Sequence, residues 1–376
     1  MRFELRQYDK ILMTFDYENL SLAGESVKIL SVNEETKHLL PIGMQLNEKG
    51  VISWLKSRVI TKNREYFDIV LSRMGLSSND TIGIIKVCKG LSLNDSYWVV
   101  EEGFLGKFDK YNLYENNFTR TLSLIAYTGY GSITAKGFTS SPEFTTNGML
   151  KKCWRREKGK IFLYKGGTSG AVNTGREPYS EFYASQIAST MGIKHVDYTL
   201  SRWKGVLSSV CELFTDINTS YVPIWRFVDN TSLIEIANKL KSFGEEVYNE
   251  FVDMLVFDAL IFNTDRHSGN FGLLIDNNTN KVKEFAPIFD NGLSLFNYGM
   301  DEDLNDLSNY SKTRRPAIGG SYEEIVKTFI TERQKSKLRK MINFKFKKHV
   351  RYNLDNKRLK QIEKFLQIRV RELIEM

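Results

Sequence analysis

Short runs of alternating apolar and polar residues occur in pairs along the chain, and a few polar residues or a glycine join the members of each pair. Successive side chains of a strand point to opposite faces, so this pattern predicts β-hairpins with one buried face. The three pairs are residues 3–8 with 11–17, 195–203 with 206–214, and 271–275 with 282–285. The second pair flanks Lys204-Gly205, which is typical of a tight turn.

Helical spacing of apolar residues occurs in several parts of the chain and predominates toward its C-terminal end. It predicts helices over residues 51–58 and 63–74, and from Pro178 to a stop at Gly192. Residues 233–262 are mostly helical in pattern, and the most apolar part of them is too short to span a bilayer. Strands that come first and helices that follow predict a two-lobed α+β body.

We expect three structural parts. The first, residues 1–117, mixes short strands and helices as a small N-terminal α/β accessory subdomain. The second, residues 118–215, is a strand-rich N-lobe, and the third, residues 216–376, is a helical C-lobe. A stretch rich in Gly, Ser and Thr, residues 128–148, marks the join to the second part.

The composition is that of a globular protein. The chain has 376 residues, of which 41% are apolar and 26% are charged. This composition argues against a disordered or a collagen-like protein. Three scattered cysteines without a C-x-x-C pair, and only four histidines, argue against a structural zinc site. They suit a reduced, cytoplasmic setting. The N-terminus lacks the apolar core of a signal peptide, and no membrane insertion is expected.

Positive charge is concentrated at the C-terminal end. Residues 331–376 contain 15 Lys/Arg against 5 Asp/Glu, and the net charge of the whole chain is +8. Such a segment suits nucleic acid, an anionic membrane or an acidic partner. The simpler interpretation is a solvated helix face, because apolar residues recur there at helical spacing. They are Leu359, Ile362, Leu366, Val370 and Leu373.

One cluster of polar residues contains the candidate catalytic and metal-binding side chains. Asp265 and Asn270 lie five residues apart between a buried helix and a strand, and Asp290-Asn291-Gly292 follows the next hairpin. Phosphoryl transfer requires one carboxylate that orients the attacking hydroxyl, and an amide oxygen and a second carboxylate that hold Mg²⁺. Asp265 suits the first role, and Asn270 with Asp290 suits the second. His267, in the same loop, is a candidate for contacts with the cofactor. By residue type it is also a base or metal ligand, but bracing the loop is the simpler role.

Residues N-terminal to this cluster are the candidates for binding the nucleotide. Lys165 ends the apolar strand over residues 160–165, and Glu181 on the following helix is placed to pair with it. A strand lysine and a helix glutamate position the α- and β-phosphates of ATP in protein kinases. The alternative is that the two residues have no role in nucleotide binding. Lys165 would then be an exposed lysine at the end of a strand, and Glu181 a glutamate favoured near the N-terminus of its helix by the helix dipole.

Further contacts to ATP are expected from two loops and one strand. Residues 139–148 and 166–175 flank the Lys165 strand, and neither matches a P-loop or a G-x-G-x-x-G motif. We favour the first loop for the phosphates, with hydroxyls from Ser140, Ser141, Thr145 and Thr146. Backbone groups from Glu212 to Phe214 are candidates for adenine contacts, with a core strand as the equal alternative.

These motifs resemble a known family. Residues 263–270, Asn-Thr-Asp-Arg-His-Ser-Gly-Asn, followed by Ala-Pro-Ile-Phe-Asp at 286–290, are similar to the HipA-like serine/threonine kinases, and closer to their CtkA-type relatives. The resemblance implies a bilobal kinase fold, with Asp265 as catalytic base and Asn270 and Asp290 as Mg²⁺ ligands. It implies Lys165 as the ATP anchor.

The same resemblance implies autophosphorylation on a serine or threonine of the phosphate loop, and many HipA proteins pair with a DNA-binding antitoxin. One departure is Asp265-Arg266-His267, where HipA proteins commonly have Asp-Asp-His; the Asp-Arg-His form also resembles phosphoinositide kinases.

The sequence therefore predicts an ATP- and Mg²⁺-dependent serine/threonine protein kinase. A lipid or small-molecule kinase is the first alternative, motivated by the Asp-Arg-His form. A pseudokinase or nucleic-acid-associated regulator is the second, motivated by the basic C-terminal segment. The presence of Lys165, Asp265, Asn270 and Asp290 favours an active enzyme.

Overall fold

The alternating pattern at the N-terminus forms the predicted hairpin. Strands β1 (Arg2–Gln7) and β2 (Lys10–Leu20) pair antiparallel, with Phe3 opposite Phe15. The two rings stack with their centroids 5.9 Å apart. A shift by one residue would turn this apolar face to solvent, so burial fixes the register.

The computed structural model describes residues 1–20, 24–132, 137–229 and 232–376. Residues 133–136, within the predicted join at 128–148, lie outside the described residues. The described chain divides into two compact units. The first unit comprises Met1–Tyr164, Thr215–Val222 and Leu274–Lys283, and the second comprises Lys165–Phe214, Pro223–Leu273 and Glu284–Met376.

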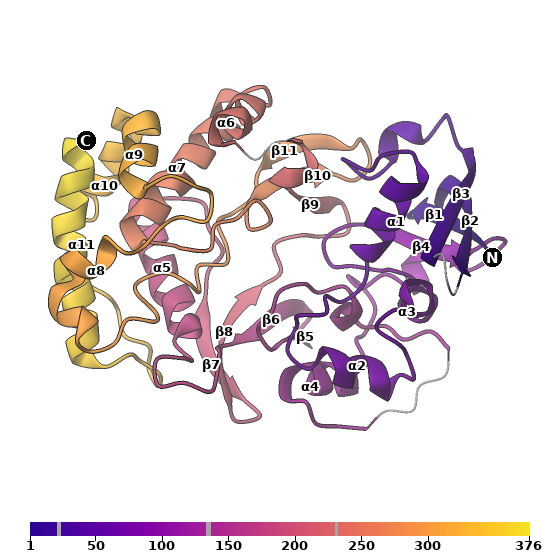
Figure 1. The fold of residues 1–376 in the computed structure, drawn as a ribbon, viewed down its shortest axis with the longest axis horizontal. Coiled ribbons are helices and arrows are strands. Elements are labelled where there is room, and N and C mark those ends of the chain that lie inside the picture. The colour runs from indigo at the N-terminus through magenta and orange to yellow at the C-terminus, as the bar shows by residue number, and fades with distance from the viewer. Residues whose placement is uncertain (21–23, 133–136, 230–231) are drawn as a thin grey trace. The chain divides into compact units, whose positions relative to one another are not determined.

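The first unit is built on a four-stranded sheet in the order β3-β2-β1-β4. Apolar side chains of α1 and α3, among them Trp54 and Ile85, pack with Phe3 and Leu5 into one buried core. A second core joins α2, α3 and α4 (Figure 1). The elements are β3 (Gly24–Val32), η1 (Lys37–Leu39), α1 (Glu48–Lys56), α2 (Phe67–Arg73), α3 (Thr81–Cys88), β4 (Tyr97–Glu101), η2 (Phe108–Lys110), α4 (Arg120–Thr128) and η3 (Pro142–Phe144).

Five more strands lie wholly or mainly in this unit. β5 and β6 are neighbours in one sheet, and another sheet has the order β11-β10-β9. Their bounds are β5 (Lys152–Glu157), β6 (Lys160–Gly166), β9 (Thr219–Pro223), β10 (Gly272–Asp276) and β11 (Lys281–Phe285). The predicted third hairpin corresponds to β10 and β11.

Helices dominate the second unit. Figure 1 shows α9, α10 and α11 beside the buried helix α7, and these helices are in contact. Strands β7 and β8 pair antiparallel around the predicted turn at Lys204-Gly205. The elements are α5 (Glu177–Met191), β7 (Thr199–Trp203), β8 (Val206–Glu212), η4 (Ile224–Arg226), α6 (Leu233–Lys241), α7 (Glu245–Ile261), η5 (Asp303–Asp306), α8 (Leu307–Ser311), α9 (Tyr322–Phe329), α10 (Glu332–Arg339) and α11 (Asn356–Glu375).

Two acidic residues interrupt the apolar sequence of α7, and both are buried and paired. Asp253 contacts Lys337 of α10 at 2.6 Å, and Asp258 contacts Arg266 at 2.9 Å. A buried carboxylate without such a partner would cost several kcal/mol, on the order of 3–5 when one member of a pair is removed. The acids of α7 therefore fix what packs beside it.

The predicted elements are largely confirmed. Helix α5 ends where Gly192 adopts a left-handed conformation with φ 71°, and the five apolar residues predicted for the last helix are all buried in α11. The predicted mixture of strands and helices is confirmed, with several sheets and eleven α-helices in the described chain. The bilobal arrangement and the three-part division at 117 and 215 stay predictions.

Candidate active site

The loop after α7 folds back on itself through side-chain amides. Phe262 ends the helix in a left-handed conformation, and Asn263 donates to Asp258 and accepts from the backbone N–H of Asp265 at 3.0 Å. Asn270 then donates its side-chain amide to the carbonyl of Asp265 at 3.0 Å. Asn and Asp side chains readily form such local bonds with the backbone. The loop thereby holds Asp265 and Asn270 near each other.

Arg266 joins this loop to the segment that carries Asp290. Its buried guanidinium donates to both oxygens of Asp258, at 2.9 and 3.1 Å, and to the carbonyl of Asn270 at 3.0 Å. The same group donates to the carbonyl of Phe289 at 2.5 Å and to the side chain of Asn291 at 2.6 Å. A planar guanidinium with five donors is suited to such a junction. Arg266 thus fixes the backbone on both sides of the candidate site.

Lys165 lies between two carboxylates. Its Nζ is 3.1 Å from Glu181 Oε1 of α5 and is also in contact with Asp290. The other oxygen of Glu181 accepts from the backbone N–H of Asn291 at 2.8 Å. Strand, helix and loop therefore meet at one ammonium group.

The charges of this cluster perturb one another. Burial lowers the pKa of the Lys165 amine, but attraction to Asp290 and Glu181 outweighs it and holds that pKa above its usual value. Burial raises the pKa of Asp265, and the negative charge of Asp290 raises it further. Asp265 and Asp290 are thus close enough to repel each other.

The donor set fits magnesium. Carboxylate and amide oxygens are the hard ligands that Mg²⁺ prefers, and it commonly takes only one or two carboxylates from a protein. The negative charge of Asp290 contributes to the raised pKa of Asp265, and a divalent cation would offset this repulsion. Asp290 and Asn270 would hold such an ion.

Three other predicted site residues lie in this unit. Phe214 packs against Phe289 with ring centroids 5.4 Å apart, and Glu212 is exposed at the end of β8. His267 is exposed, and its Nδ1 accepts from the backbone N–H of Gly269 at 3.0 Å. That bond suits the bracing role. The nucleotide contacts of these residues stay predictions.

The predicted phosphate loop is described in the first unit. Ser141 accepts from the N–H of Glu143, Thr145 donates to the carbonyl of Leu91, and Thr146 donates to that of Pro142. The hydroxyl oxygen of Ser140 is buried without a hydrogen-bond partner among the described residues. The hydroxyls of Ser141, Thr145 and Thr146 thus stabilise the loop itself. Contact with a phosphate, or phosphorylation, at these three residues or at Ser140 stays a prediction.

Other residues of the site were not found from the sequence. Glu177 is buried and accepts from the hydroxyls of Thr168 and Tyr298, at 2.5 and 3.0 Å, so it ties the loop after Lys165 to α5. The hydroxyl of Tyr198 accepts from the N–H of Asp290 at 3.3 Å. One feature of the sequence did point to the role of Arg266. Asp258 is an acidic residue in an apolar helix, and a buried acid requires a partner. In the structure that partner is Arg266.

No helix in the described part of the chain combines the length and apolar character needed to cross a bilayer. The search of family models gave no match.

Known proteins nevertheless resemble the chain. It is 30% identical over 132 residues to the serine/threonine-protein kinase CtkA of Helicobacter pylori strain J99, which covers 31% of this chain and 40% of that protein. The match therefore spans less than half of the relative.

Solved structures were compared as well. A crystal structure of the proinflammatory kinase CtkA of Helicobacter pylori aligns with 60% of this chain and 91% of its own, at 19% identity and a TM-score of 0.44. The HipA, HipB and operator DNA complex of the Shewanella oneidensis MR-1 toxin–antitoxin system contains a chain that aligns over 100% of this chain and 99% of its own. Its identity is 13% and its TM-score 0.56, so the likeness concerns the fold. The resemblance predicted from the sequence is confirmed: part of the chain is similar to the kinase CtkA in sequence, and the whole chain is similar in fold to a chain of the HipA complex.

Proposed function

We propose that this chain is an ATP- and Mg²⁺-dependent phosphotransferase that phosphorylates serine or threonine in proteins, itself included. Asp265 is the catalytic base, Lys165 holds the phosphates of ATP, and Asn270 with Asp290 would hold Mg²⁺. When bound, the ion supplies charge neutralisation at the phosphates. Antitoxin-like partners, a bilobal arrangement and a cytoplasmic location belong to the same proposal.

The reaction needs little covalent chemistry from the protein. The oxygen of the acceptor hydroxyl forms a bond to the γ-phosphorus while the bond from that phosphorus to the β,γ-bridging oxygen breaks, and ADP leaves. The hydroxyl proton passes to a carboxylate oxygen of Asp265, whose raised pKa makes it a better proton acceptor than an exposed aspartate. Lys165 offsets charge on the phosphates, and Arg266 holds the loop that carries the base.

One observation carries this proposal: the ammonium of Lys165 is paired with both Glu181 and Asp290. A strand lysine bound to a helix glutamate is the arrangement that kinases use for ATP. The contact with Asp290 brings the residue that would bind the metal to the residue that would bind the phosphates. A structural ion pair alone does not need a third charged partner from a separate loop.

The proposal is tested by incubating the full chain with Mg²⁺ and γ-labelled ATP, with and without a serine/threonine peptide mixture. Asp265→Asn should lower labelling by a factor of about 10²–10⁴, the usual contribution of a positioned base. Asp301→Asn is the matched control, because Asp301 is exposed and outside the cluster. Equal labelling by both variants would refute the assignment, and mass spectrometry would separate phosphorylation from transfer of the nucleotide or labelling of lipid.

A further inference from the structure

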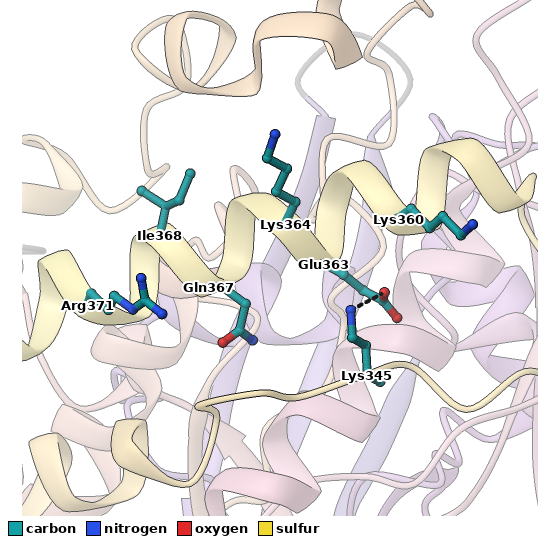
Figure 2. Close-up of a pocket in the computed structure, with 7 residues that line it drawn as sticks. All are labelled: Lys345, Lys360, Glu363, Lys364, Gln367, Ile368 and Arg371. Atoms are coloured by element: carbon teal, nitrogen blue, oxygen red, sulfur yellow. Dashed lines mark hydrogen bonds and ion pairs between the residues drawn. The ribbon is translucent and has the colours of Figure 1, made fainter.

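Helix α11 presents a basic stripe on its exposed side. Lys360, Lys364 and Arg371 point outward along the helix, and Lys345 comes from the preceding segment (Figure 2). With Glu363 and Gln367, these side chains line an open pocket of about 700 Å³. The opposite side of α11 is buried in the second unit, so the stripe is carried on a fixed element.

The segment before α11 is fastened alongside the helix. Glu363 accepts from the N–H of Phe346 at 2.9 Å and pairs with Lys345 at 3.3 Å, and Gln367 accepts from the N–H of Asn343 at 2.8 Å. Gln186 of α5 exchanges two hydrogen bonds with the backbone of Lys347, at 2.8 and 3.0 Å. These bonds place the exposed side chains of Lys345 and Lys347 next to the stripe.

The cations of this surface are poorly neutralised. Lys345 is the member of this surface that pairs with a carboxylate, that of Glu363, whereas within the described chain Lys347, Lys360, Lys364 and Arg371 form no ion pair. Like charges one helical turn apart, such as Lys360 and Lys364, repel each other. These positively charged side chains are held in a row, and the protein itself does not neutralise them. Such a surface favours the binding of an extended anion.

We propose that this stripe binds the phosphate backbone of nucleic acid. From Lys360 to Arg371 the helix rises about 16 Å, at 1.5 Å per residue. That length matches about five base pairs of a duplex, which carries one charge per roughly 1.7 Å of axis. The cations form a line along one helix, which suits a linear polyanion rather than a compact ligand.

A membrane surface fits the stripe less well. A helix that enters the headgroup region needs a free apolar face, and most apolar residues of α11 are buried. Only Ile368, 42% exposed, adds an apolar side chain to the pocket among the described residues.

The test measures binding of the full chain to a fluorescent 20-base-pair duplex of mixed sequence, by anisotropy at several salt concentrations. Each phosphate contact contributes about 0.9 to the slope of log K against log salt. Neutralising three contacts in Lys360→Gln/Lys364→Gln/Arg371→Gln should therefore lower that slope by about 2–3 and weaken binding at least tenfold at low salt. The control, Lys281→Gln/Lys312→Gln/Lys327→Gln, removes the same charge from other exposed positions and should keep the wild-type slope.

The outcomes are decisive and independent of kinase activity. Asp265→Asn should bind the duplex as the wild type does, so loss of catalysis and loss of binding are separable. Equal slopes for the stripe variant and the wild type would overturn the proposal. So would binding to phosphatidylserine vesicles or to polyglutamate with no binding to the duplex, since these identify a membrane or an acidic protein as the partner.

Discussion

The guanidinium of Arg266 holds the carboxylate of Asp258 with two hydrogen bonds, Nε to Oδ2 at 2.9 Å and the second nitrogen to Oδ1 at 3.1 Å. Both side chains are almost fully buried. The remaining donors of Arg266 reach the carbonyls of Asn270 and Phe289. A pair inside the helical core is therefore also the anchor for both loops of the candidate site.

Breaking this pair should cost both stability and activity. Arg266→Met leaves the buried carboxylate of Asp258 without its cationic partner, and such a change costs about 3–5 kcal/mol in the free energy of unfolding. Urea unfolding followed by circular dichroism measures this cost. We expect phosphoryl transfer by the remaining folded protein to fall as well, because the carbonyls of Asn270 and Phe289 lose their donor.

A double variant separates the two effects. Asp258→Leu/Arg266→Met removes both charges, and an apolar replacement of a buried pair is often close to neutral for stability. It should regain stability relative to Arg266→Met without regaining activity. Recovery of both together would mean that Arg266 acts only through the stability of the core.

A second buried pair stabilises the first unit. Arg64 contacts the carboxylate of Glu143 at 2.5 Å and donates to the carbonyl of Lys152 at 2.7 Å. Arg64→Met should lower the free energy of unfolding by about 3–5 kcal/mol, because Glu143 has no exposed surface. Lys62→Met, two residues away and exposed, is the matched control. Similar urea midpoints for the two variants would contradict this prediction.

Local patterns allowed much of the fold to be predicted. Alternation located the hairpins, and the left-handed Gly192 ends α5 where the sequence placed its stop. The Lys165 strand and the helix with Glu181 were expected for the same local reasons. The junction at Arg266 was not, because its partners lie 4 to 25 residues away along the chain and no periodic pattern records such contacts. The bond between Thr168 and Glu177 likewise depends on how the loop closes in space.

Stability should depend on pH through Glu250. Burial raises the pKa of this carboxyl above its usual 4.5, and the charges of Glu246 and Glu284 raise it further. The folded state therefore keeps the proton to higher pH than the unfolded state, and stability falls as pH rises through and above 4.5. Glu250→Gln removes this titration. The variant should be more stable than the wild type at pH 7, and the difference should shrink toward pH 4.

Thermal or urea unfolding across this pH range measures the effect. Glu245→Gln serves as the control, since Glu245 is exposed on the same helix. A difference between Glu250→Gln and the wild type that grows as the pH falls would have the wrong sign and would contradict the assignment.

The last prediction concerns Lys165, whose side chain is 11% exposed between Glu181 and Asp290. Lys165→Arg keeps the charge but replaces a compact ammonium with a longer planar group, which does not fit the same geometry. We expect kcat/KM for ATP to fall at least tenfold, while the charge keeps the two carboxylates neutralised and the protein folded. Lys165→Met should lose activity further and also stability, since both carboxylates lose their cation. Lys160→Arg, exposed at the start of the same strand, is the control and should behave as the wild type. Full activity of Lys165→Arg would mean that the ammonium serves the fold and not the nucleotide.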